Sequence, residues 1–300
     1  MMKMNVALCQ FTPGTGKSSV EDNISRVADL IEEAVHAHVK PDLVMLPEMW
    51  QAALALGKNA PSASEQGAEL EETLDGRCVS FLRKLAQKHH IWIAGGSLFL
   101  KKDDGKRYNS QIIIDRDGNI AGIYDKTHLC EWVGEHNGVA YGKGISPVKT
   151  EFGILAPILC YDIRFEELIR GYSFAGAQIL LVPACFSTNL NHWRLLVQTR
   201  ALENQMFVLG CGCCGDYPLE YKGQTYPINE SGQQIYTDKF IHYMGHSMIV
   251  DPEGKILAEA GDDACVIRAT LDLDRVTQVR QSVSYIESVR PTVYKHYHNN

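Results

Sequence analysis

Acidic, basic and thiol side chains each follow an apolar, strand-like run at well-separated positions of the chain. Glu48, Lys126 and Cys160 each come directly after such a run. A carboxylate, an ammonium group and a thiol could serve as a general base, an electrostatic stabiliser and a nucleophile in covalent catalysis. Glu48 or Lys126 alone also fits a surface charge, and Cys160 alone fits a strand-end cysteine without a role. The combination of the three therefore indicates a site more strongly than any one of them.

Cys160 has the most informative surroundings of the three. The run Ile154–Leu159 predicts a strand, and Tyr161–Glu167 predicts the start of a helix with Asp162 as a plausible cap. A residue at a sharp strand-to-helix turn projects its side chain outward, while the amides of the turn can face an oxyanion. The helix N-terminus and nearby cations are also expected to lower the pKa of the Cys160 thiol. The same context fits turns without activity, so the local sequence leaves the role of Cys160 open.

Two other motifs look chemical but fit their templates poorly. Thr12–Ser18 lies between a strand and a helix, as a phosphate-binding loop would, yet Phe11 replaces the first glycine and Pro13 lacks an amide donor. A connecting loop before the helix is the favoured interpretation. Cys211–Cys214 lacks zinc-knuckle spacing and a second cysteine pair, which favours buried strand residues over a metal site.

Strand-like and helix-like segments alternate through most of the chain, which is typical of α/β folds. The predicted strands are Met4–Gln10, Asp42–Leu46, Ile91–Ser97, Ser110–Asp115, Ile120–Asp125, Val148–Glu151, Ile154–Cys160, Gln178–Pro183, Phe207–Cys213, His246–Asp251, Lys255–Ala258 and Ala264–Leu271. The predicted helices are Ser18–Ala37, Gly76–His90, Phe165–Ala175, His192–Met206 and Asp274–Ser282. Turn residues at Asp115–Asn119 and Asp251–Gly254 predict a hairpin each. Asp75 stands where the N-cap of the second helix is expected.

Length and composition indicate a globular chain. It has 300 residues, 45 % hydrophobic and 22 % charged, and can bury one large core or two smaller ones. The net charge of −7 argues against nonspecific binding to a nucleic-acid backbone. The apolar runs fall far short of the ~20 residues of a membrane span, and the N-terminus does not resemble a signal peptide. Because the nine cysteines accompany no export signal, we expect reduced thiols and a cytoplasmic location without membrane contact.

The chain shows no linker, low-complexity stretch or block of charge, so we expect a single domain over residues 1–300. Residues 214–240 are rich in Tyr, Gly, Pro and Gln and are expected to form a long inserted loop. Residues 283–300 are expected to form a C-terminal tail. Because long loops are uncommon unless functional, residues 214–240 could form a lid or arm that selects the substrate. A passive surface insertion is the alternative.

The three candidate residues lie within longer motifs that carry a resemblance. Leu46–Glu48, Tyr124–Leu129 and Leu159–Phe165 resemble the three signatures of the nitrilase superfamily, the carbon–nitrogen hydrolases. Arg200–Gln205 and Gly245–Gly254 are supporting matches, and the motifs occur in the family's order over nearly the whole chain. The resemblance implies an α/β fold, a four-layer α-β-β-α sandwich, that usually pairs into a larger layered dimer.

The resemblance also implies a role for each residue of the site. Glu48 would be the general base, Cys160 the nucleophile, and Lys126 a stabiliser of the oxyanion together with the backbone N–H of Tyr161. The stretch from Lys126 is similar to the omega-amidase-like branch of the superfamily. The second glutamate of that branch falls on Glu135, which would position Lys126 or assist the base.

Further residues are candidate substrate contacts under the same resemblance. They are Arg164, Phe186 and Thr188, the last two because Phe186–Asn189 is similar to the omega-amidase-like branch. Arg164 could hold the strand-to-helix turn or the far carboxylate of the substrate. A salt bridge to an acidic helix neighbour is the alternative for Arg164.

The expected reaction is hydrolysis of the terminal amide of a small carboxylic or dicarboxylic monoamide, through a Cys160 thioester and with release of ammonia. Hydrolysis of a nitrile or an N-carbamoyl compound by the same residues is the alternative, and a catalytically silent binding protein is the alternative of another class. We expect no metal and no organic cofactor. The expected partners are a small amide and further copies of the chain, in a homodimer or higher homo-oligomer.

Overall fold

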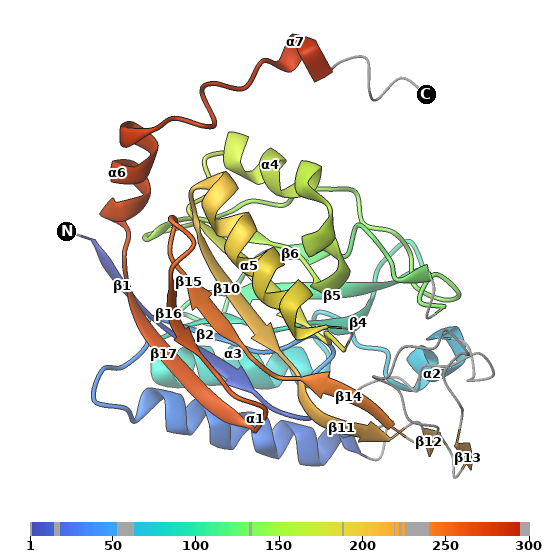
Figure 1. Cartoon of the computed structure of the whole chain (residues 1–300). Helices are drawn as coiled ribbons and strands as arrows, with labels where there is room; N and C mark the ends of the chain where they lie inside the picture. The colour runs from blue at the N-terminus through green and yellow to red at the C-terminus, as the bar shows by residue number, and fades with distance from the viewer. Residues whose placement is uncertain are drawn as a thin grey trace.

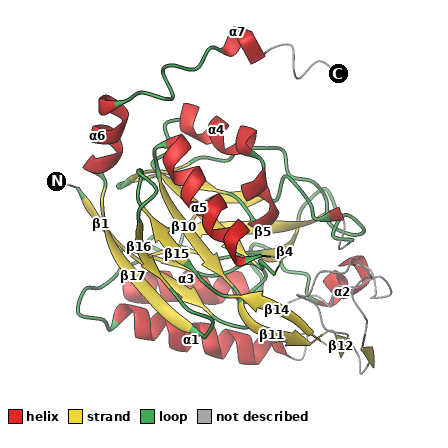
Figure 2. Cartoon of the chain, viewed as in Figure 1, coloured by secondary structure: helices red, strands yellow, loops and turns green. Residues whose placement is uncertain are grey.

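The computed structural model describes residues 2–14, 19–52, 63–131, 134–187, 189–218, 220–221, 224–225 and 240–294. Within these ranges, two large β-sheets lie face to face with helices on their outer sides (Figures 1 and 2). The helices are α1 (Val20–Val35), α2 (Ala63–Glu69), α3 (Arg77–His89), α4 (Glu166–Phe174), α5 (Leu190–Asn204), α6 (Asp274–Ser282) and α7 (Pro291–Tyr294).

The first sheet has seven strands in the order β17-β1-β2-β3-β5-β4, with β6 paired to β5. Its strands are β1 (Lys3–Gln10), β2 (Leu43–Met45), β3 (Trp92–Ala94), β4 (Leu98–Lys101), β5 (Arg107–Ile114), β6 (Ile120–Asp125) and β17 (Cys265–Asp272). The strands β1, β2 and β3 are parallel, whereas the others pair antiparallel with their neighbours. The loop after β2 therefore leaves the sheet at the same edge as the ends of β1 and β3.

The second sheet has six strands in the order β16-β15-β10-β9-β8-β7. Its strands are β7 (Val148–Thr150), β8 (Gly153–Pro157), β9 (Ile179–Ala184), β10 (Phe207–Gly212), β15 (Met248–Val250) and β16 (Ile256–Glu259). The central strands β8, β9 and β10 are parallel. Two small antiparallel sheets pair β11 (Cys214–Pro218) with β14 (Phe240–Met244), and β12 (Glu220–Tyr221) with β13 (Gln224–Thr225).

The alternation of side chains along each strand produces three buried layers. In β1, Val6 and Leu8 pack between the two sheets, whereas Ala7 and Cys9 pack under α1 and α3. In the second sheet, alternate residues of Ile179–Val182 pack between the sheets and under α4 and α5. Strands that are buried on both sides read as continuous apolar runs, which is why the sequence shows them clearly. The expected four-layer α-β-β-α sandwich is confirmed (Figure 1).

The structure contains the predicted helices and strands, with their ends shifted by a few residues. Both predicted hairpins are confirmed. Asp115–Asn119 joins β5 to β6, and Asp251–Gly254 joins β15 to β16. The prediction of Asp75 as a helix cap is wrong, because Gly76 is the N-cap of α3. The carboxylate of Glu72 instead accepts the backbone N–H of Cys78 in the first turn, at 3.2 Å. Glu72 thus satisfies an amide of the first helical turn that was expected to bond to Asp75.

The stretch expected to be an irregular loop, residues 214–240, begins and ends as strand. Its ends form β11 and β14, whose antiparallel pairing corrects that expectation. Residues 219, 222–223 and 226–239 lie outside the described residues. The backbone N–H of Met244, at the end of β14, donates to the carbonyl of Phe186 at 3.3 Å. The base of this hairpin is therefore joined to the segment that follows β9.

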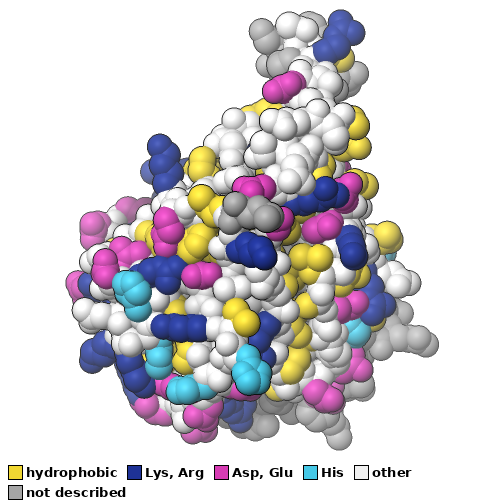
Figure 3. All heavy atoms as spheres, turned by 90° about the vertical axis from the view of Figure 1, so that its left-hand side faces the viewer, with side chains coloured by type: hydrophobic (Ala, Val, Ile, Leu, Met, Phe, Trp, Pro, Cys, Tyr) yellow, Lys and Arg dark blue, Asp and Glu magenta, His cyan; other side chains and the backbone are white. Residues whose placement is uncertain are grey.

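Three further observations concern the C-terminal segment, the surface and the helices. After α6, residues 283–294 project away from the layers, at the top of Figure 1. On the face drawn in Figure 3, Lys and Arg side chains are interspersed with Asp and Glu. In the part of the chain that the structure describes, no helix combines the length and apolarity needed to span a membrane.

Candidate active site

Glu48 lies where β2 ends, buried between the two sheets. The strand stops before Leu46, and the chain turns at Met49, whose φ of 49° is held by a hydrogen bond from its N–H to Ser97 Oγ at 2.9 Å. Glu48 is only 2 % exposed. A carboxylate buried this deeply requires partners, because desolvation strongly disfavours its charged form.

Lys126 supplies the main partner of Glu48. It follows β6, and its Nζ lies 2.9 Å from Glu48 Oε1. The same ammonium nitrogen lies 3.1 and 2.9 Å from Oε1 and Oε2 of Glu135, whose Oε2 also accepts the backbone N–H of Cys130 at 2.8 Å. One buried cation is thus shared by two buried carboxylates, which brings together three residues predicted from separate parts of the chain.

Cys160 lies at the sharp turn after β8. Its φ of 44° places it in the left-handed region, which is rare for residues other than glycine and typical of nucleophile elbows. It opens a 3-10 turn, Cys160–Arg164, before α4 begins, so the predicted helix start is shifted to Glu166. The buried Asp162 carboxylate ties this turn down by accepting the Leu159 N–H at 3.1 Å and the Tyr124 hydroxyl at 2.7 Å.

The charges of the cluster set the protonation of its members. Burial opposes ionisation of Glu48, but the charge of Lys126 and hydrogen bonds from Lys126, Cys160 and Cys185 outweigh it and lower the pKa of Glu48. Lys126 is likewise desolvated, yet Glu135 and Glu48 raise its pKa well above the usual value. Glu48 and Lys126 therefore form a buried ion pair at neutral pH.

The expectation of a lowered thiol pKa at Cys160 is wrong. Burial, followed by the charge of Glu48, raises the pKa of Cys160 well above its usual value, and the attraction of Lys126 does not compensate. Cys160 is consequently a neutral thiol beside an ionised Glu48. This arrangement fits a base that removes the proton as the sulfur attacks, and not a preformed thiolate.

Two residues that the sequence analysis did not single out also touch Glu48. Asn109, inside β5, donates from Nδ2 to Glu48 Oε1 at 3.0 Å and to Glu135 Oε1 at 2.9 Å. The backbone N–H of Cys185, just after β9, donates to Glu48 Oε2 at 2.9 Å. Cys185 ends an apolar run, the same signal that marks Cys160, whereas the signal of Asn109 is only a polar residue within a buried strand.

The predicted substrate contacts cluster around the elbow as far as the structure describes them. The guanidinium carbon of Arg164 lies 5.1 Å from the ring centroid of Phe186 and 6.0 Å from that of Tyr161. These three residues therefore line one region next to Cys160. Thr188 lies outside the described residues. So does the part of the Thr12–Ser18 motif from residue 15 onward.

Comparison with known proteins identifies the family. The model of the carbon-nitrogen hydrolase family matches residues 5–281. The chain belongs to the carbon-nitrogen hydrolase family. Among its relatives, a 2-oxoglutaramate amidase from Bacillus subtilis is 32 % identical over 98 % of this chain and 100 % of its own length. Omega-amidase NIT3 from Saccharomyces cerevisiae is 31 % identical over 97 % of this chain and 95 % of its own length.

Solved structures of carbon-nitrogen hydrolases share the fold. Nit3 from Saccharomyces cerevisiae, described as a member of branch 10 of the nitrilase superfamily, matches with a TM-score of 0.75 and 29 % identity over 94 % of both chains. A carbon-nitrogen hydrolase from Helicobacter pylori G27 matches with a TM-score of 0.84 and 24 % identity over 99 % of both chains. The resemblance to the nitrilase superfamily is thereby confirmed.

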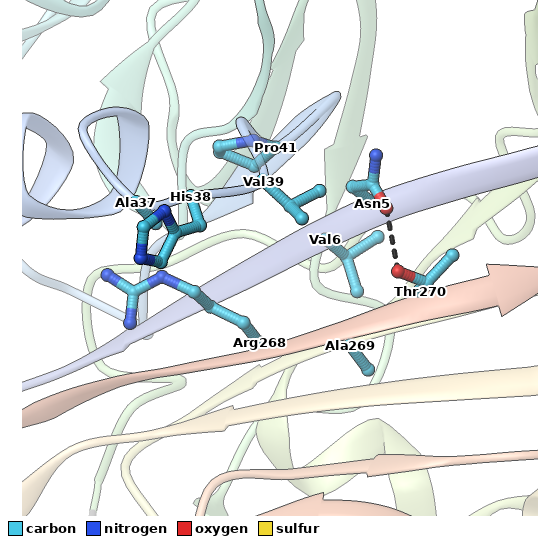
Figure 4. Close-up of a pocket in the computed structure, with 9 residues that line it drawn as sticks. All are labelled: Asn5, Val6, Ala37, His38, Val39, Pro41, Arg268, Ala269 and Thr270. Atoms are coloured by element: carbon cyan, nitrogen blue, oxygen red, sulfur yellow. Dashed lines mark hydrogen bonds between the residues drawn. The ribbon is translucent and has the colours of Figure 1, made fainter.

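A surface hollow of about 300 Å³ lies between β1, β17 and the segment that follows α1 (Figure 4). Its residues are Asn5, Val6, Ala37, His38, Val39, Pro41, Arg268, Ala269 and Thr270. The strand residues Asn5 and Val6 belong to the first half of β1, whereas Glu48 follows the end of the neighbouring β2. The hollow is mostly apolar and shares no residue with the candidate site.

Proposed function

We propose that this carbon-nitrogen hydrolase is an amidase that cleaves the terminal amide of a small carboxylic or dicarboxylic monoamide through a Cys160 thioester. The observation that carries the proposal is the buried group of Glu48, Lys126 and Glu135 beside the Cys160 elbow. An ionised base, a fixed cation and a thiol on a strained turn are the parts that covalent amide hydrolysis requires.

The first half of the proposed reaction forms the thioester. Glu48 takes the proton of Cys160 as its sulfur attacks the amide carbonyl carbon, and the carbonyl oxygen becomes an oxyanion. Lys126 and the backbone N–H of Tyr161 stabilise that oxyanion. When the tetrahedral intermediate collapses, the protonated Glu48 gives its proton to the nitrogen, and ammonia leaves as the C–N bond breaks.

The second half returns the enzyme to its starting state. Glu48, again ionised, removes a proton from water as the water oxygen attacks the thioester carbonyl. Collapse of the second tetrahedral intermediate breaks the C–S bond and releases the carboxylic acid product. The Cys160 sulfur takes back a proton from Glu48, so no oxidant, metal or cofactor enters the proposed cycle. Glu135 holds the Lys126 ammonium throughout, through the bonds of 2.9 and 3.1 Å described above.

The names of the relatives support a small amide as the substrate, since two of them are a 2-oxoglutaramate amidase and an omega-amidase. Arg164, stacked against Phe186 beside the elbow, supports a carboxylate at the far end of that substrate. Hydrolysis of a nitrile or N-carbamoyl compound by the same residues is the second candidate within this class.

An ammonia-release screen tests the proposal. Small monoamides with and without a second carboxylate, nitriles and N-carbamoyl compounds are incubated with the wild-type chain and with Cys160→Ala. Release of ammonia from monoamides by the wild type alone supports the proposal. Preference for nitriles or carbamoyl compounds favours the second candidate, and saturable binding without ammonia release favours a silent binding protein.

The proposal extends to the organisation of the protein. It comprises a single domain over residues 1–300 and a homodimer or higher homo-oligomer in the cytoplasm. Exposed apolar side chains on α5, Leu195 and Leu202, support burial of that helix against another copy. Sedimentation equilibrium tests the assembly, and a mass equal to one chain at micromolar concentration contradicts it.

The proposal also assigns a role to residues 214–240, in the choice of substrate and not in the chemistry. The hydrogen bond from Met244 to Phe186 supports it, because it joins β14, the strand that begins at the end of this stretch, to a predicted substrate contact. Replacing residues 218–238 with a short Gly/Ser linker is expected to change the ranking of amides while Cys160 still reacts with a thiol reagent. An unchanged ranking in a folded variant makes the segment passive.

A further inference from the structure

The amide of Asn109 bridges the two carboxylates of the candidate site. Asn109 is fully buried in β5, and its Nδ2 lies 3.0 Å from Glu48 Oε1 and 2.9 Å from Glu135 Oε1. Its backbone carbonyl accepts the N–H of Lys126 at 2.9 Å. One residue inside a strand therefore contacts all three charged members of the cluster.

The orientation of this amide follows from its partners. Ionised carboxylates accept hydrogen bonds and cannot donate them, so the NH₂ group of Asn109 must face Glu48 and Glu135. An amide NH₂ has two hydrogens, which matches the two carboxylates one for one. Asn109 thereby adds two donors without adding charge.

Such donors matter because the charges of the cluster do not balance. Two buried carboxylates share the single positive charge of Lys126. Like charges held close together favour protonation of one of them, whereas hydrogen bonds to the ionised form oppose it. The other titratable groups that surround Glu48 are the thiols of Cys130, Cys160, Cys185 and Cys213.

We propose that Asn109 is a positioning residue that keeps Glu48 anionic and fixes its carboxylate so that Oε2 is left to receive the proton of Cys160. The two donors of Lys126 and Asn109 occupy Oε1 at 2.9 and 3.0 Å. On Oε2, the backbone N–H of Cys185 at 2.9 Å leaves a second lone pair. The inference rests on the proposed function, since it assumes that Glu48 acts as the base.

Loss of the Asn109 side-chain amide is expected to change the pH dependence of kcat/KM more than the binding of substrate. Without its donor, Glu48 holds its proton more tightly, so the acidic limb of kcat/KM moves to higher pH by about one unit or more. At a pH below the shifted limb, kcat falls by about ten- to a hundredfold while KM changes little, because Asn109 does not contact substrate.

The experiment compares three substitutions, Asn109→Asp, Asn109→Ser and Asn109→Leu, which respectively replace, shorten and remove the polar group. Asn204→Leu is the matched control. Asn204 is an equally buried asparagine whose Nδ2 donates to the Arg200 carbonyl at 3.2 Å and which has no contact with the cluster. Each variant is measured by thermal melting and by kcat and KM against pH on an amide that the wild type hydrolyses.

A second readout does not depend on the substrate. The rate at which iodoacetamide alkylates Cys160 is followed against pH by mass spectrometry of the Cys160 peptide. The alkylation rate should fall as the pH drops through the pKa of Glu48, because Glu48 must be ionised to take the thiol proton. We expect this acidic limb of the rate to move to higher pH in every folded Asn109 variant and to stay in place in Asn204→Leu. If the wild type releases no ammonia from any compound but the alkylation limb still moves, the proposed function fails and the positioning role stands.

Three outcomes overturn the inference. One is a folded Asn109 variant in which the acidic limbs of kcat/KM and of the alkylation rate both stay at the wild-type pH. Another is an equal shift of these acidic limbs in Asn204→Leu, which would show that the limbs depend on the stability of the fold and not on hydrogen bonds to the carboxylates of Glu48 and Glu135. The third is failure of all three Asn109 variants to fold while Asn204→Leu folds, which would make Asn109 a purely structural residue.

Discussion

The backbone N–H of Cys185 lies 2.9 Å from Glu48 Oε2, although 137 positions separate the two residues. Glu48 follows β2 of the first sheet, and Cys185 follows β9 of the second. This hydrogen bond therefore joins the two sheets at the centre of the candidate site. The geometry of the proposed base, Glu48, depends on the assembled sandwich, because neither sheet alone supplies all of its partners.

Replacement of the predicted nucleophile is the most direct test of the chemistry. Cys160→Ser is expected to lower kcat by several orders of magnitude, since a serine hydroxyl is much less acidic than a thiol and a carboxylate activates it poorly. Binding of substrate should persist. Ammonia release is measured, with Cys265→Ser as the control, because Cys265 is a partly buried free cysteine in β17. More than about a tenth of wild-type activity in Cys160→Ser would remove Cys160 as the nucleophile.

Removal of the shared cation is expected to destabilise the fold as well as the reaction. Lys126→Met leaves Glu48 and Glu135 buried without a counterion, a change that typically costs about 3–5 kcal/mol of unfolding free energy. Lys102→Met is the matched control, because Lys102 pairs with Asp125 at 2.5 Å but is 31 % exposed. Its loss should cost about 1 kcal/mol or less. Urea unfolding measures both, and equal losses would show that the Lys126 pair is no more important to folding than a surface pair.

The lowered pKa of Glu48 predicts a broad pH range of activity. Glu48 must be ionised to accept a proton, so activity is present above its pKa and is lost as the pH falls through it. Because that pKa lies below the ordinary value of 4.5, kcat/KM should stay level down to about pH 5. On the alkaline side, the raised pKa of Lys126 keeps its charge to above about pH 10. A wild-type acidic limb between pH 6 and 7, with circular dichroism unchanged, would contradict this assignment.

The sequence revealed Glu48, Lys126 and Cys160 and missed the contacts that Asn109 and Cys185 make with Glu48. Glu48, Lys126 and Cys160 each follow an apolar run, which is a local signal. Asn109 lies inside β5, and nothing near it in the sequence indicates that β5 and the end of β2 meet at one point. The contact of Cys185 with Glu48 depends in the same way on the packing of one sheet against the other.

The same distinction explains the error about the Cys160 thiol. A helix N-terminus and a nearby cation, both readable from the motif, argued for a lowered pKa. Burial and the charge of Glu48, which only the folded chain supplies, outweigh them and raise it. The strands of the two sheets could be predicted because they are apolar on both sides, whereas the hairpin of β11 and β14 carries no such pattern. The four-layer arrangement of those strands was predicted from the resemblance to the nitrilase superfamily.

Chelation is expected to leave activity unchanged. The proposed cycle uses Glu48, Lys126, Glu135, Cys160 and the backbone N–H of Tyr161. The described ranges contain no group of three or more His, Cys, Asp or Glu side chains placed to hold a metal ion. Ammonia release is measured after dialysis against EDTA and again after divalent metals are added back. Loss of activity that one specific metal restores would overturn the metal-free cycle.

The position of Arg164 predicts which amides the enzyme prefers. Its guanidinium lies against Phe186 and Tyr161, next to the elbow that carries Cys160, and a planar guanidinium can bind a carboxylate through two parallel hydrogen bonds. Arg164→Met is therefore expected to raise KM for a dicarboxylic monoamide by about ten- to a hundredfold. A neutral amide of similar length should be affected much less, because it offers no charge to the arginine.

A matched control separates this role from a structural one. Arg170, on α4, pairs with Glu166 at 2.8 Å and donates to the Glu203 carbonyl at 2.8 Å, so its charge is already engaged and Arg170→Met should change neither KM. The quantity that decides is the ratio of kcat/KM for the charged amide to that for the neutral amide. If Arg164→Met lowers both values equally, Arg164 only holds the turn after Cys160. If the ratio falls in Arg164→Met and not in Arg170→Met, the Arg164 guanidinium binds the far carboxylate of the substrate.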